Sequence, residues 1–74
     1  MNTNNTGALD LFIEEVTARA EAFSKAGNDE TSADVYALAL EAEEIIGAVK
    51  AGLMSQHEAM EWLEDARVRL GDIG

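Results

Sequence analysis

The sequence predicts an all-α fold of three antiparallel helices, a helical hairpin followed by a third helix, which assembles as a homodimeric bundle. Apolar residues recur at steps of three and four in three separate segments, the spacing of one helix face. Glycines and short polar stretches separate the segments, and no strand-length stretch alternates β-branched with polar residues. The predicted helices cover residues 7–26, 32–51 and 56–70. They form a single domain over residues 7–74, preceded by a flexible lead-in at residues 1–6.

The first predicted helix carries its apolar residues on one stripe, and both of its ends show capping signals. Thr6 or Asn5 offers an N-cap, and Gly27 follows the last turn, where a left-handed closing residue is common. The stripe consists of Leu9, Phe12, Ile13, Val16, Ala20 and Phe23. These features predict a helix with one buried face.

The second predicted helix begins after Thr31, an N-cap candidate with Asp34 three positions later. It ends before Gly52, a second candidate for a left-handed closing residue. Its core stripe consists of Val35, Leu38, Ala39, Ala42, Ile45, Ile46 and Val49. The short polar connection before it favours packing against the first helix.

The third predicted helix has the clearest start signal in the chain. Ser55 and Glu58 match the S-x-x-E capping box, in which each side chain bonds the backbone N–H of the other residue. The stripe that follows consists of Ala59, Leu63, Ala66 and Leu70, with Met60 beside it. We expect Gly71 to close this helix.

The second predicted helix differs from the other two because it is apolar on two opposite faces. At about 100° per residue, the side opposite its core stripe carries Ala33, Tyr36, Ala37, Leu40, Gly47 and Ala51, flanked by Glu41, Glu43 and Glu44. A helix of this kind is normally buried on both sides, whereas a three-helix monomer covers only one. The alanines alone also fit an exposed surface, but a helical glycine costs roughly 0.5–1 kcal/mol relative to alanine. We therefore predict a two-fold homodimer with these six residues at the interface.

The chain is strongly acidic, with 5 Lys+Arg against 15 Asp+Glu and a formal charge of −10. This balance argues against direct binding to nucleic acid or to an anionic membrane, since both need a basic surface. No apolar stretch approaches the roughly 20 residues of a membrane helix, and no signal peptide is evident, so we expect a cytoplasmic protein. A basic protein partner, such as a nucleic-acid-binding protein, would suit the charge, and the chain would then mimic DNA.

The third predicted helix carries a candidate partner-binding site. Glu58, Glu61 and Asp65 share one sector of the helix with Asp72, and Trp62 lies between this sector and the core stripe. An aromatic anchor beside a charged rim is the usual anatomy of a binding hot spot. The alternative is a solvated acidic face beside a partly buried core tryptophan.

No group of residues in the sequence points to catalysis or to a cofactor. The chain has no Cys and one His, and His57 with Glu61 would supply only half of a metal site. The serines have no nearby His to activate them, and no glycine-rich phosphate loop is present. We therefore expect a non-enzyme with no metal and no cofactor.

These features predict a small acidic, non-catalytic interaction protein that binds a host protein and inhibits or modulates it. In style it is similar to small phage proteins that act as inhibitors or anti-activators. The alternative is a structural or assembly module that acts through self-association or with a sister helical protein. Both need similar apolar interface residues, so the second helix leaves the choice open.

Overall fold

The computed structural model describes residues 6–73, which form three α-helices and no strand. α1 spans Gly7–Lys25, α2 spans Asp29–Lys50 and α3 spans Gln56–Asp72. The prediction of an all-α fold is confirmed. No helix within residues 6–73 has both the length and the apolarity to cross a membrane. The predicted lead-in at residues 1–6 lies outside the described residues except for Thr6, the N-cap of α1, whose side chain makes no capping bond.

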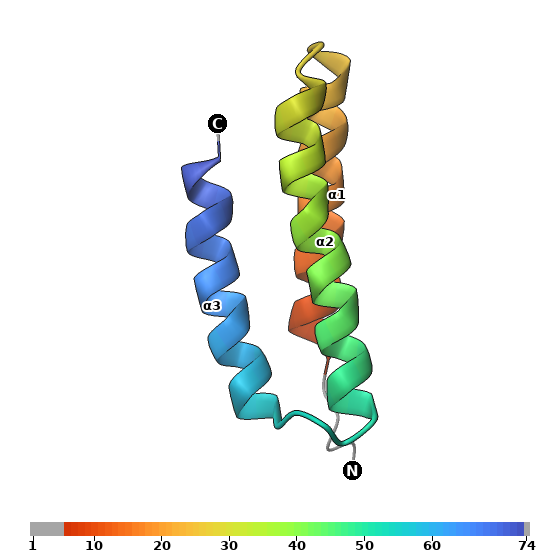
Figure 1. The fold of residues 1–74 in the computed structure, drawn as a ribbon, viewed down its shortest axis with the longest axis vertical. Helices are drawn as coiled ribbons and strands as arrows, with labels where there is room; N and C mark the ends of the chain where they lie inside the picture. Colours follow the sequence, from red (N-terminus) through yellow and green to blue (C-terminus); the bar gives the residue numbers. More distant parts are fainter. Residues whose placement is uncertain (1–5, 74) are drawn as a thin grey trace.

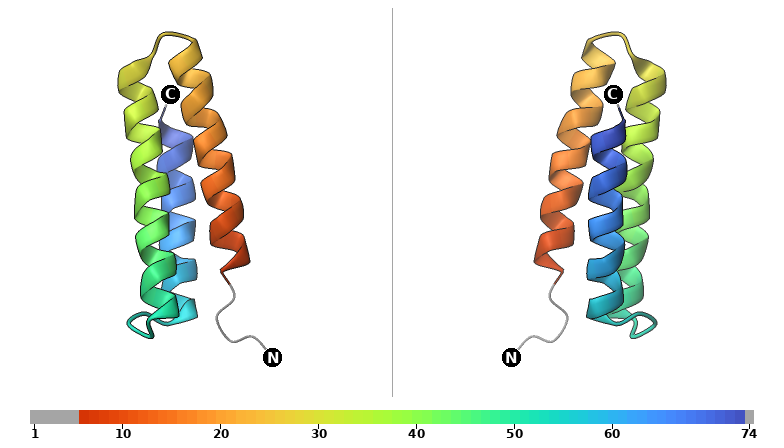
Figure 2. Two further views of the ribbon diagram at one scale, coloured as in Figure 1. Left: turned by 90° about the vertical axis from the view of Figure 1, so that its right-hand side faces the viewer. Right: turned by 90° about the vertical axis from the view of Figure 1, so that its left-hand side faces the viewer.

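α1 and α2 lie side by side as a pair, and α3 runs alongside the pair, between the two helices in the views of Figure 2 (Figure 1, Figure 2). The turn at residues 26–28 lies at one end of the pair, and the connection at residues 51–55 lies at the other. α2 packs more extensively against α1 than against α3. The side of α2 that faces neither helix is therefore left uncovered.

Glycine closes α1 and α2 in the left-handed conformation that the sequence predicts. Gly27 has φ +82° and Gly52 has φ +77°. Past the first of these, the N–H of Asn28 donates to the carbonyl of Phe23 at 2.8 Å, and the equivalent bond follows Gly52. This arrangement is the Schellman motif, which satisfies carbonyl groups that the helix leaves without an internal partner.

α2 begins three residues earlier than the sequence pattern predicts. Its N-cap is Asn28 rather than Thr31, and the Asn28 side-chain oxygen accepts a hydrogen bond from the Thr31 N–H at 3.4 Å. Asparagine is among the best N-caps, and Asp29 and Glu30 add negative charge in the first turn, where the helix dipole favours it. The polar stretch expected to be a connection is therefore the first turn of the helix.

α3 begins at Gln56 as predicted but continues past the glycine expected to close it. The capping box of Ser55 and Glu58 is complete, with both bonds present. Gly71 is helical, and the helix ends at Asp72, followed by Ile73 in extended conformation. Ile73 packs partly buried against the core, which favours continuing the helix through the glycine. At the other two C-termini the helices end one residue before the predicted bounds.

The core lies between the three helices and is built from the predicted stripes. Its largest fully buried side chain is Phe12. The buried apolar residues are Leu9, Phe12, Val16 and Ala20 of α1, Val35, Leu38, Ala39, Ala42 and Val49 of α2, and Ala59, Leu63, Ala66 and Leu70 of α3. The many alanines allow the helix axes to approach closely, because interaxial distance depends on the side chains at the contact. The three predicted core stripes are confirmed, except that Ile13, Phe23, Ile45 and Ile46 are only partly buried at the edge of the core.

Candidate protein-interaction surface

The side of α2 opposite the core is exposed along its length, and we name it the outward face of α2. It consists of Ala33, Tyr36, Ala37, Leu40, Gly47 and Ala51, the residues predicted to form a self-association surface, and all six are exposed. Tyr36 is 49% exposed and Leu40 is 52% exposed, one helical turn apart. Of the other large exposed apolar side chains, Leu11 lies on α1, Val68 lies on α3, and Leu53 lies in the connection between α2 and α3. Scattered residues of that kind are normal on a monomer, whereas Tyr36 and Leu40 lie next to each other on one helix face.

Gly47 has no packing role within its own chain. Its φ is not positive, so its conformation is one that any residue adopts in a helix. A Cβ atom built at Gly47 would meet no other atom within 4 Å. The glycine therefore leaves open space on the outward face of α2, where a second helix can approach closely.

The acidic sector of α3 is exposed, but part of it already serves the fold. Glu58 completes the capping box, with its carboxylate accepting from the Ser55 N–H at 3.1 Å. The hydrogen bond from the Ser55 backbone, and then that from its hydroxyl, hold the pKa of Glu58 below its ordinary value. Asp65 pairs with Arg69 at 3.2 Å, and Glu61 lies 3.7 Å from His57. Within residues 6–73 no group of three or more His, Asp or Glu side chains could hold a metal ion.

Trp62 packs toward the core, although the sequence pattern also allowed a freely exposed anchor. Its side chain is partly buried, and its ring meets that of Phe12 edge to face, with centroids 6.1 Å apart and an interplanar angle of 89°. The guanidinium of Arg67 lies 5.4 Å from the centroid of the same Phe12 ring. Trp62 therefore joins α3 to α1, and its contribution to any binding surface is limited to its exposed part.

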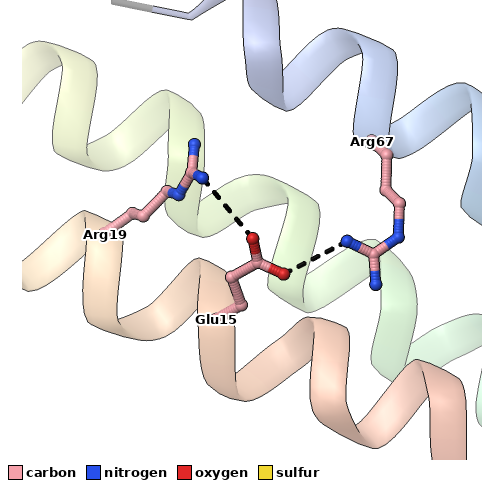
Figure 3. Close-up of polar contacts among 3 residues, drawn as sticks. All are labelled: Glu15, Arg19 and Arg67. Carbon is pink, nitrogen blue, oxygen red and sulfur yellow. Dashed lines mark hydrogen bonds and ion pairs between the residues drawn. The ribbon is translucent and has the colours of Figure 1, made fainter.

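Two arginines of α3 form ion pairs with the other two helices, which the sequence pattern did not predict. Glu15 of α1 accepts from Arg67 at 3.2 Å and from Arg19 at 3.5 Å (Figure 3). Arg69 pairs with Glu41 of α2 at 3.9 Å. Of these three pairs, Glu15–Arg19 alone has a signal in the sequence, its i,i+4 spacing, because the other two join residues on different helices.

These pairs change how the charge is displayed on the surface. Three of the five cationic side chains, Arg19, Arg67 and Arg69, are paired within the chain. The remaining two, Lys25 and Lys50, lie in the last turns of α1 and α2. The helix sides between those ends therefore present mainly carboxylates to a partner.

Comparisons of the chain with protein-family models, with curated proteins and with solved structures found no significant match. The surface of the molecule is therefore the basis for a functional proposal. Two regions of it stand out, the outward face of α2 and the acidic sector of α3 formed by Glu58, Glu61, Asp65 and Asp72.

Proposed function

We propose that the chain is a small acidic, non-catalytic interaction protein of the cytoplasm, an antiparallel three-helix bundle that binds other protein through the outward face of α2. The observation that carries this proposal is the half-exposure of Tyr36 and Leu40 on the side of α2 opposite the core. Removing such apolar surface from water is the main favourable term in protein association. The open space at Gly47 lets a partner approach the helix backbone closely.

The charge of the chain favours a basic surface on the partner. Glu43 and Glu44 lie on α2 beside the apolar residues, and Glu61 and Asp72 are exposed on α3. Carboxylates so placed suit a nucleic-acid-binding protein, whose Lys and Arg side chains otherwise contact phosphates. The chain would inhibit or modulate such a protein by occupying that surface, and complementary charge would speed association in a salt-dependent way.

Affinity capture from a bacterial lysate tests this function, with Leu40→Glu as the probe and Val68→Glu as the matched control. Both changes add one carboxylate at an exposed apolar position, but Val68 lies on α3, away from the outward face of α2. We expect the wild type and Val68→Glu to retain the same basic protein at low salt and to release it at high salt. Leu40→Glu should retain none of it. Equal capture by Leu40→Glu would refute the role of the α2 face.

A second candidate is an assembly module that acts through self-association or with a sister helical protein. Gly47 favours it, because a glycine in open space inside a helix fits a close helix–helix crossing. Light scattering on the purified chain separates the two candidates. A strict monomer at high micromolar concentration would exclude self-association, and Leu40→Glu should convert any dimer to monomer.

A further inference from the structure

The outward face of α2 is close to self-complementary about Leu40. We propose that its occupant is α2 of a second copy of this chain, antiparallel to the first, about a two-fold axis that passes beside Leu40. This inference rests on the second candidate above, self-association, and names the partner of that surface; a basic foreign protein would have to compete with the second copy for the same face. Charge and residue size along α2 carry the argument.

The small residues of the face match one another in this register. Ala33, Leu40 and Gly47 recur at intervals of seven residues, the repeat that keeps two helices in contact along their length. When Leu40 lies opposite its own copy, Ala33 lies opposite the partner's Gly47, once on each side of the axis. Both positions are exposed, and nothing lies within 4 Å of a Cβ built at Gly47, so the two backbones can approach closely at these points. The Leu40 pair then fills the centre of the contact.

The glutamates of α2 decide the relative direction of the two helices. Glu43 and Glu44 are exposed and lie beside Leu40. In a parallel pair the glutamates of both copies would lie at one level, with Glu44 beside the partner's Glu43. In the antiparallel register Glu43 and Glu44 of one copy lie about seven residues along the axis from those of the other copy, roughly 10 Å at 1.5 Å per residue. This distance exceeds the Debye length of about 8 Å at physiological ionic strength, so the repulsion between the glutamates is largely screened.

The antiparallel register also places favourable neighbours on the partner beside Glu43 and Lys50. Glu43 lies beside the partner's Tyr36, whose hydroxyl can donate a hydrogen bond to a carboxylate. Lys50, in the last turn of α2, lies beside the partner's Asp29 in the first turn. Within residues 6–73 Lys50 makes no ion pair of its own. By symmetry each contact forms twice, so opposite charges meet at both ends of the interface.

Disulfide cross-linking tests the register, because the chain has no Cys and each introduced thiol is unique. Leu40→Cys lies on the proposed axis and should give a covalent dimer under mild oxidation. Gly47→Cys alone should stay monomeric on a denaturing gel, since its two copies would lie on the order of 20 Å apart along the axis, and a disulfide needs Cα atoms within about 7 Å. Gly47→Cys mixed with Ala33→Cys should cross-link.

The possible results separate this inference from the proposed function. A covalent dimer of Gly47→Cys alone would show a parallel pair and overturn the register, while leaving the outward face of α2 as the binding surface. A monomeric wild type with no cross-link in any sample would overturn the second-copy proposal. The proposed function would then be decided by the capture experiment with Leu40→Glu, which does not depend on self-association.

A charge substitution gives an independent measurement. Lys50→Gln removes the contact with the partner's Asp29 at both ends and should raise the dimer dissociation constant about three- to tenfold at low salt. Lys25→Gln is the matched control, since Lys25 occupies the equivalent last turn of α1. It should leave the dissociation constant unchanged. Equal effects of the two substitutions in sedimentation experiments would contradict the proposed contact.

Discussion

Replacing Gly47 by alanine should stabilise the monomer. The residue lies inside α2 with a φ that is not positive, and an added Cβ would meet no atom within 4 Å. Alanine therefore adds no clash, and it reduces the conformational entropy of the unfolded chain. The expected gain is roughly 0.5–1 kcal/mol in the free energy of unfolding. For a domain of this size a gain of 1 kcal/mol corresponds to a rise in Tm of about 4–8 °C.

Urea denaturation followed by the fluorescence of Trp62 measures this effect, at protein concentrations low enough to keep the chain monomeric. Gly71→Ala is the positive control, since Gly71 is also helical and open. Gly52→Ala is the negative control and should destabilise, because Gly52 has φ +77°. A lower midpoint for Gly47→Ala beside a higher one for Gly71→Ala would refute the reasoning. At high concentration Gly47→Ala should instead weaken the proposed dimer, because its methyl group would lie against the partner's Ala33.

Four further outcomes follow from contacts within the monomer and are measured by the same denaturation experiment. Trp62→Ala should cost about 2 kcal/mol, because it removes the edge-to-face contact with Phe12, and Trp62→Phe should cost less. Glu15→Gln should cost about 0.5–1 kcal/mol at low salt and close to nothing in 1 M NaCl (on the order of ten times the physiological ionic strength), since its two arginine partners are half-exposed. Ser55→Ala should cost about 1 kcal/mol through loss of the N-cap; a change below about 0.2 kcal/mol would contradict the capping role. The lowered pKa of Glu58 means that its stabilising effect is full above the ordinary glutamate pKa of 4.5 and is lost as the pH falls through the lower folded-state pKa, so wild type and Glu58→Gln should converge in acid.

Local signals predicted the helix ends wherever a few adjacent residues complete the structure. The capping box of Ser55 and Glu58 and the left-handed Gly27 and Gly52 all formed as expected. Each depends on hydrogen bonds within about five residues, so distant parts of the chain have little influence on it. The start of α2 is the exception, because the pattern predicts Thr31 as the N-cap, whereas Asn28 caps the helix three residues earlier.

The sequence by itself determined the all-α class, the three core stripes and the second apolar face of α2. The reason is that the spacing of apolar residues within a helix fixes which of its faces are apolar, whatever the helix packs against. Only the tertiary structure decided how α3 meets the other two helices. It placed Trp62 against Phe12 and brought Arg67 to Glu15, residues 52 positions apart in the chain. The physical reason is that the rotation and offset of one helix against another are set by how all their side chains fit together at once.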